Sequence, residues 1–326
     1  MSLAPFVHAM ARGPARGRNL TRLEAKTAMG LILSGQAAPE AIGALFMLMR
    51  YRGETADEIA GFVDAMRDHG PRYKNISVDV DWPSYAAGRT RGLPLFLLSA
   101  KLVANAGYRV MLHGWNSHQN PIADPRAAVS RVGIAQASSV KQAEDALECD
   151  GIVYVPLEAM SDRLLELLKL RDVLGLRSPV NTALRTWNPG GAGLSVQGVF
   201  HPTYRDLQRN AGMLLGQRDL LVLKGAGGEF ERNPGKDIIV SGLKQDEPVE
   251  HAEPAFVDSL RRMNGGEVDQ SSLSAVWSGE LDDPFASAVV VGTAALVLSR
   301  LEKISEVQAR ERAEILWTDR RKPVAA

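Results

Sequence analysis

The sequence of 326 residues is poor in cysteine and lacks carboxylates over two long stretches. Cys149 is its single cysteine, which excludes an intramolecular disulfide and a zinc cluster built on cysteines. No apolar run is expected to reach the roughly 18 to 20 residues of a membrane span. The first arginines are not followed by a long apolar stretch, so no secretory signal is predicted. These absences predict a cytoplasmic protein without membrane contact.

The charges are balanced in number but unevenly placed, with 38 basic and 38 acidic residues. Carboxylates are absent from residues 82–123 and again from residues 173–204, although basic residues fall within both stretches. The first stretch contains Arg89, Arg91, Lys101 and Arg109, and the second contains Arg177 and Arg185. A neutral protein with this distribution can present a basic face. Scattered, solvated charges are the alternative interpretation.

The first seventy residues carry the periodicity of helices. Thr21 with Glu24, and Thr55 with Glu58, each fit a capping box that precedes a helical apolar pattern. A further short helix is expected near Phe6. We predict a small helical domain over residues 1–72, joined by a helical return near residues 160–185.

The rest of the chain alternates between strand and helix patterns. Strands are predicted at residues 76–81, 108–112, 152–155, 194–200, 219–223 and 237–240. Helices are predicted at residues 93–106, 139–147, 160–174, 254–263, 284–299 and 304–317. Such alternation favours an α/β fold with a central, mostly parallel sheet, here over residues 73–326.

Residues 174–231 contain the strongest single pattern. Two apolar runs of strand length flank about fifteen residues that open with His201-Pro202, where proline suits a first helical turn. This is a β-α-β unit, and the loop from Gly225 to Glu231 leaves the carboxyl end of its second strand. Ligands of open α/β sheets bind at such ends.

The same region resembles the anthranilate phosphoribosyltransferase family, whose motifs LGxRTxFNxLGPLxNP and QVxGVFHP align with residues 174–202. The matching positions are Arg177, Asn181, Asn188, Pro189, Ala192, Gln197, Gly198, Val199, Phe200, His201 and Pro202. Residues 20–55 echo a helical motif of the same family. The resemblance implies a homodimer formed through the helical domain, for which the apolar faces at Leu31, Ile42 and Phe46 are the candidates.

The motifs with which this family binds phosphoribosyl diphosphate and Mg²⁺ are degraded in the sequence. W-P-S-Y-A-A-G-R-T-R-G stands in place of the phosphate loop GTGGD, and P-L-F-L stands in place of NxST. The KHGNR motif keeps His113-Gly114, and the Asp-Glu metal pair is reduced to Phe230-Glu231, with Glu229 before it. The residual family-site positions are His113, Gly114, Asn188 and Pro189. This pattern predicts a non-catalytic relative without a cofactor.

Positive charge replaces the lost motifs, and residues 83–91 resemble a divergent branch of the family known for nucleic-acid binding. We therefore hypothesise a basic cleft that binds DNA or RNA with little sequence preference. Its predicted contacts are Arg89, Arg91, Lys169, Arg171, Arg177 and Arg185. The alternative is an active phosphoribosyltransferase that uses phosphoribosyl diphosphate and Mg²⁺, with Glu229 and Glu231 as metal candidates and Arg177 for an aromatic acid. A structural partner protein without a ligand is the third possibility.

Overall fold

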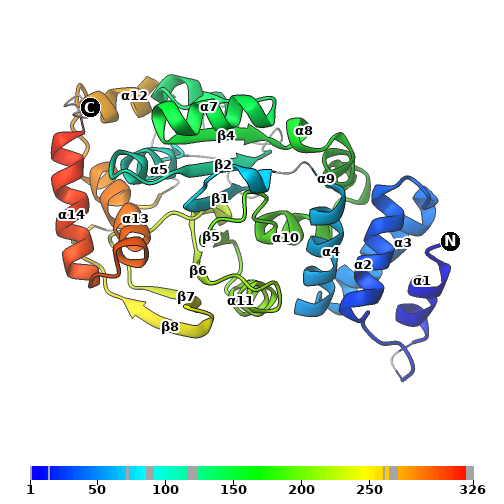
Figure 1. The fold of residues 1–326 in the computed structure, drawn as a ribbon. Coiled ribbons are helices and arrows are strands. Elements are labelled where there is room, and N and C mark those ends of the chain that lie inside the picture. The colour runs from blue at the N-terminus through cyan, green and yellow to red at the C-terminus, as the bar shows by residue number, and fades with distance from the viewer. Residues whose placement is uncertain are drawn as a thin grey trace.

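A computed structural model describes residues 2–13, 15–70, 73–85, 92–115, 124–259, 261–263 and 271–320, apart from the Lys74 side chain. A helical layer at the N-terminal side lies beside one eight-stranded sheet that is covered by helices (Figure 1). This arrangement confirms the predicted α/β class with a helical layer and a mostly parallel sheet.

The helical layer begins with α1 (Ala4–Ala11), α2 (Arg22–Leu33), α3 (Pro39–Arg52) and α4 (Ala56–His69). Thr21 and Thr55 are the N-caps of α2 and α4, and each forms the complete capping box with the glutamate three residues later. Apolar residues of α2, α3 and α4 share one buried core, which includes Phe46 and Phe62. Both capping boxes expected from the sequence are therefore confirmed.

The sheet has the strand order β3-β4-β2-β1-β5-β6-β7-β8. Its parallel strands are β1 (Val80–Ser84), β2 (Val110–Gly114), β3 (Ala135–Gln136), β4 (Ile152–Pro156), β5 (Leu194–Val199) and β6 (Asp219–Lys224). Strands β7 (Ile238–Lys244) and β8 (Glu247–Glu253) add an antiparallel hairpin at one edge. The crossovers contain α5 (Phe96–Asn105), α6 (Pro125–Val129), η3 (Ser130–Val132), α7 (Val140–Asp150) and α11 (Tyr204–Leu214).

Helices α8 (Leu157–Met160), α9 (Asp162–Leu174) and α10 (Pro179–Thr186) return to the N-terminal helices. Their buried residues Leu164, Leu167 and Val180 belong to the same core as α2, α3 and α4. In Figure 1, α10 lies between the sheet and α4, and α9 lies above the upper end of α4. The return therefore forms the seam between the helical layer and the sheet.

Three helices close the other side of the sheet: α12 (Ser271–Ser278), α13 (Pro284–Glu302) and α14 (Glu306–Asp319). Helix α13 is long and apolar enough to cross a membrane, which the sequence prediction missed. However, 72% of its apolar window is buried against the rest of the fold. Val289, Val290 and Leu296 of α13 share a core with β1, β2 and α5, as expected for a core helix of a globular fold.

One predicted helix is wrong, two elements were not predicted, and one strand begins later than expected. No helix forms among the described residues of 254–263, because the segment is held extended: Phe256 N donates to Pro234 O, and Arg232 Nη2 donates to Pro254 O. Strand β8 and helix α12 were not predicted. Strand β1 begins at Val80 rather than near Ile76, since the Asp79 carboxylate accepts a hydrogen bond from the Arg109 amide at that point.

Candidate functional site

A cavity of about 270 Å³ lies where the helical layer, the helical return and the β5–α11 connection meet. Its walls come from the end of α3, the α9–α10 turn, α10, and the first half of α11. The lining residues are Arg50, Glu54, Arg171, Gly175, Leu176, Arg177, Ser178, Asn181, Thr182, Arg185, Val199, Phe200, His201, Tyr204 and Gln208. The site therefore lies beyond the carboxyl end of β5, where α/β sheets bind ligands.

The lining of this cavity is rich in arginine. Among the described lining residues, four carry guanidinium groups and Glu54 is the one carboxylate. Arg177 is half-buried and its guanidinium lies 5.5 Å from the centre of the Phe200 ring. Burial lowers the pKa of Arg177, and the nearby charges of Arg171 and Arg50 lower it further. A cation raised in energy by burial and by like charges is stabilised by an anionic ligand.

A polar chain links the helical layer to α11 across the cavity. Arg50 Nη1 donates to the Tyr204 hydroxyl, which donates to Glu54 Oε2 at 3.2 Å. Burial raises the pKa of both Tyr204 and Glu54. One wall of the cavity therefore offers hydroxyl and carboxylate oxygens, while Arg177 and Arg171 supply positive charge on the α9–α10 side.

Arg185 is a structural cation at the base of the cavity and is only 5% exposed. Its Nη1 donates to Gly198 O and to Gly228 O at 2.7 Å, and its Nη2 donates to Tyr85 O at 2.8 Å. Burial lowers its pKa to about 10, which leaves the guanidinium charged at neutral pH. One side chain thus joins the end of β1, strand β5 and the loop after β6.

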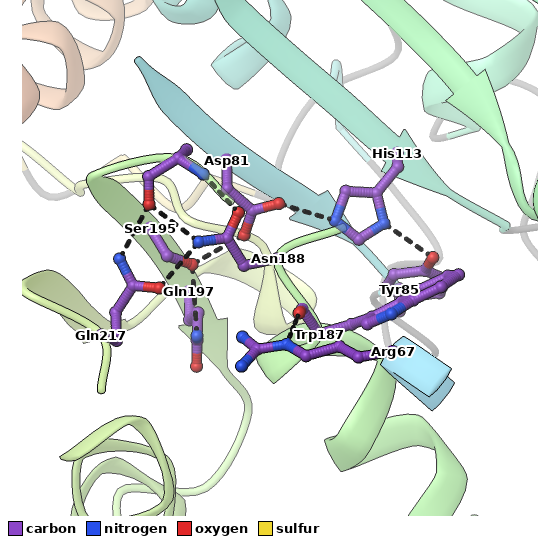
Figure 2. A network of polar contacts seen from close by, with 10 residues as sticks. Arg67, Asp81, Tyr85, His113, Trp187, Asn188, Ser195, Gln197 and Gln217 are labelled. Carbon is purple, nitrogen blue, oxygen red and sulfur yellow. Dashed lines mark hydrogen bonds and ion pairs between the residues drawn. The ribbon is translucent and has the colours of Figure 1, made fainter. Parts of the chain in front are cut away.

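A buried hydrogen-bond network crosses β1, β2 and β5, as Figure 2 shows. It runs from Asp81 and Ser195, near the amino ends of β1 and β5, to His113 near the carboxyl end of β2. Asp81 Oδ1 lies 3.1 Å from His113 Nε2, and His113 Nδ1 lies 2.9 Å from the Tyr85 hydroxyl. Asp81 Oδ2 accepts from Ser195 Oγ at 2.7 Å, and Ser195 Oγ accepts from Gln197 Nε2 at 3.3 Å. Burial raises the pKa of Tyr85 well above its usual range, so the hydroxyl stays protonated.

The other residual family positions stabilise the backbone. Gly114 lies against β1, and a Cβ there would come within 2.0 Å of Ser84 O, so only glycine fits. The buried Asn188 side chain donates to Ala192 O at 2.8 Å and accepts from Ala192 N at 2.9 Å, closing the turn that also contains Pro189. Neither Gly114, Asn188 nor Pro189 lines the cavity.

The two metal candidates, Glu229 and Glu231, are each only 1% exposed. Glu229 Oε1 accepts from Ser84 Oγ at 2.9 Å, and Glu231 Oε1 accepts from the Phe96 amide at the start of α5 at 3.0 Å. Mg²⁺ in proteins keeps several water ligands, which requires carboxylates that water can reach. As arranged, these two acids do not fit a hydrated Mg²⁺ ion.

Of the six predicted nucleic-acid contacts, the structure brings Lys169, Arg171 and Arg177 together around one small pocket. Arg89 and Arg91 lie outside the described residues. Lys169 Nζ lies 5.7 Å from the centre of the Trp115 ring, and Arg171 and Arg177 line the cavity. Arg185 is buried and bonded to three carbonyls, so it cannot meet a phosphate backbone.

Sequence reasoning missed the part of the cavity wall that includes Arg50, Glu54 and Tyr204. Arg50 and Glu54 lie in the R-Y-R-G-E-T segment, within the echo of the helical motif, and Tyr204 follows His201-Pro202 by two residues. Their positions next to matched motifs were the information in the sequence that could have pointed to them. Their convergence depends on the packing of α10 against α3 and α11, which no local pattern shows.

Residues 12–70 match the model of the glycosyl transferase family, helical bundle domain. The chain is 30% identical over 233 residues to an anthranilate phosphoribosyltransferase of Geobacillus stearothermophilus, covering 71% of this chain and 68% of that protein. It is 26% identical over 315 residues to the enzyme of the same name from Geobacillus kaustophilus, covering 93% of this chain and 91% of the relative.

Solved structures share the fold. Anthranilate phosphoribosyltransferase from Thermus thermophilus superposes with a TM-score of 0.75 at 21% identity, covering 97% of both chains. The Saccharomyces cerevisiae enzyme in complex with PRPP (phosphoribosyl diphosphate) and Mg superposes with a TM-score of 0.78 at 13% identity, covering 97% of this chain and 93% of that one. The prediction of a non-catalytic nucleic-acid-binding protein is wrong, because these relatives are named as enzymes and none as a nucleic-acid-binding protein.

Proposed function

The chain belongs to the anthranilate phosphoribosyltransferase family, and on that basis we propose that it transfers a phosphoribosyl group to a small anionic acceptor. The observation that carries the proposal is the arginine-rich cavity beyond the carboxyl end of β5. Its volume of about 270 Å³ suits a small molecule rather than a polymer. Anthranilate, the acid for which the relatives are named, is the first acceptor to test.

The cavity residues would bind and orient the acceptor. Arg177 would pair with the carboxylate of an aromatic acid, since the charges nearest to it are those of Arg171 and Arg50. The Phe200 ring under Arg177 offers an apolar surface beside that charge. In phosphoribosyl transfer the acceptor nucleophile bonds to the anomeric carbon of the ribose as diphosphate leaves. Orientation of the acceptor by two walls of the cavity would supply the proximity that such a displacement needs.

Residues 86–91, where the family's phosphate loop would lie, are outside the described residues, and Glu229 and Glu231 do not fit a hydrated Mg²⁺ ion as they are placed. No step of the reaction is therefore assigned to a metal. The buried Asp81, His113 and Tyr85 would keep the ends of β1 and β2 fixed beneath the donor.

Turnover with phosphoribosyl diphosphate and anthranilate tests the function, followed by the loss of anthranilate fluorescence as product forms. We expect turnover in the wild type and its loss in Arg177→Ala, with Arg218→Ala as the control on an exposed arginine. Stabilisation by the donor gives an independent readout: at ~100 times its dissociation constant a ligand adds roughly 2.7 kcal/mol to the free energy of unfolding. The proposal would be overturned if a panel of aromatic acids gave no turnover and the donor gave no stabilisation.

Homodimerisation through the helical layer remains a proposal, but its candidate residues change. Leu31, Ile42 and Phe46 belong to the core of a single protomer and are not available to a partner. Leu23 on α2 and Tyr51 on α3 are 73% and 91% exposed and replace them as candidates. A monomeric mass at micromolar concentration would contradict the dimer. The cytoplasmic location likewise stays a prediction.

A further inference from the structure

Far from the arginine-rich cavity, three side chains suited to metal ligation converge from two elements. His251 and Glu253 alternate along β8 and so face the same side, and Glu306 lies in the first turn of α14. One potential ligand atom from each of the three lies within 4.8 Å of the others. Figure 1 shows the hairpin edge and the start of α14 at the same end of the molecule. Sequence reasoning singled out none of these residues as a site.

The two carboxylates are oriented by neighbouring donors. Ser299 Oγ donates to Glu306 Oε1 at 2.9 Å, and Arg232 Nη1 lies 3.4 Å from Glu253 Oε2. The remaining atoms are less well satisfied: Glu306 Oε2 and His251 Nε2 are buried, and neither has a hydrogen-bond partner among the described residues. His251 Nε2 approaches Glu253 Oε1 to 3.3 Å without meeting hydrogen-bond geometry. Buried polar atoms are normally paired, and a cation placed between these two atoms would satisfy both.

The two carboxylates lie among basic residues, beside an open cavity. Glu253 is buried and Glu306 is half-buried, so both carboxylates are partly shielded from water. Arg232, Arg300 and Arg310 offset the negative charge of the pair. Arg232 contacts Glu253 Oε2, whereas His251 lies next to Glu253 Oε1. An open cavity of about 390 Å³, lined by His251, Ser299 and Glu306 among others, gives a solvated ion access to the cluster.

We propose that His251, Glu253 and Glu306 bind a divalent cation of the zinc type, with the fourth position open to the adjoining cavity. One imidazole and two carboxylates with an open position is a ligand set of the kind Zn²⁺ accepts in proteins. Mg²⁺ prefers oxygen ligands in octahedral geometry, so it is expected to bind this site poorly. Bound metal would join the β7–β8 hairpin to α14, since the ligands come from both.

The test is a calorimetric titration of the full-length protein with Zn²⁺ after chelator treatment and removal of the chelator. We expect one ion per chain and a higher melting temperature, with no such response to Mg²⁺. Glu306→Gln and His251→Ala remove ligands and should each weaken binding by more than about tenfold, because loss of an outer-shell contact already costs ~10 to 100-fold. Ser299→Ala, which removes such a contact, should weaken binding by about tenfold.

Glu247→Gln, at the other end of β8, and His8→Ala, on α1, are the matched controls and should bind as the wild type does. Circular dichroism establishes that each variant is folded, and two independent ligand variants guard against one failing to fold. Absence of stoichiometric binding in the wild type would overturn the site. Equal binding in the wild type, His251→Ala and Glu306→Gln would place the metal on other residues and would overturn it equally.

Discussion

Replacing Arg185 by lysine tests whether this residue is a structural brace rather than a ligand contact. The substitution keeps the positive charge and its burial but exchanges a planar fork of donors for one ammonium group. Arg185 now serves three backbone carbonyls at once, those of Gly198, Gly228 and Tyr85. An ammonium on a shorter stem cannot hold three acceptors that belong to three different segments.

The expected cost follows from the hydrogen bonds that lysine cannot make. Hydrogen bonds to charged groups contribute about 1.5 to 3 kcal/mol each, and carbonyls left unpaired in the interior add to the loss. If lysine keeps one of the three acceptors and loses two, the free energy of unfolding falls by about 3 kcal/mol or more. Arg218→Lys is the matched control, because the Arg218 side chain is 61% exposed and makes a weak ion pair, with Nε 4.0 Å from Asp219 Oδ2. It should change the free energy by less than about 0.5 kcal/mol.

Urea denaturation followed by circular dichroism and by tryptophan fluorescence measures this change. The two signals must give coincident transitions, because only then is a single free energy of unfolding defined for a chain of this size. We expect the midpoint to fall in Arg185→Lys with the slope unchanged. A loss no larger than that of Arg218→Lys would refute the assignment of Arg185 as the residue that joins β1, β5 and the loop after β6.

Three further predictions concern the cavity, the buried network and a helix cap. Arg177→Ala should weaken acceptor binding by about tenfold or more, because a hydrogen bond to a charged group contributes about 1.5 to 3 kcal/mol. The urea midpoint should stay unchanged, since Arg177 pairs with the ligand rather than with the protein. Unchanged acceptor binding by calorimetry would contradict this role of Arg177. Tyr85→Phe should lower the free energy of unfolding by about 1 to 3 kcal/mol, because the buried His113 Nδ1 loses its partner. Tyr108→Phe, on a half-buried tyrosine outside the network, is the control. The Arg18 guanidinium holds the pKa of Glu24 at about 2, below its ordinary 4.5, so this stability is present above pH 4.5 and is lost as pH falls towards 2. Glu24→Gln should therefore flatten the pH dependence of urea unfolding across that window and cost about 1 kcal/mol at pH 7, and an unchanged profile would contradict the role of the pair.

The elements that were predicted well are those with a local physical cause. The capping boxes at Thr21 and Thr55 contain their own hydrogen-bond partners within four residues, so both helix starts were found. The buried parallel strands β4, β5 and β6 show as short apolar runs between turn residues. Strand β8 was missed because its sequence, E-P-V-E-H-A-E, carries charge on an edge strand and has little apolar character.

The residues of the candidate site that the sequence predicted all lie within a matched family motif or next to it. Arg177 and Asn181 came from the matched run. Arg50 on α3, Glu54 in the α3–α4 connection and Tyr204 on α11 meet only through tertiary packing. The network of Asp81, His113 and Tyr85 was likewise beyond a sequence pattern, since its members are 28 and 32 residues apart and are joined only by the pairing of β1 with β2.

The error in the functional hypothesis has a physical origin in the carboxylate-free stretches. A run of arginines without acids was interpreted as an exposed basic surface, as charge patterning alone suggests. The second stretch instead includes β5 and α10, whose residues are largely buried. There, Arg185 pairs with carbonyls rather than carboxylates, and Arg177 lines a small cavity. Acids are absent because backbone oxygens supply the counter-dipoles for one arginine and, on our proposal, an anionic ligand supplies the partner for the other. Local lack of acid therefore distinguishes a polyanion surface from a small-molecule site only once the burial of each arginine is known.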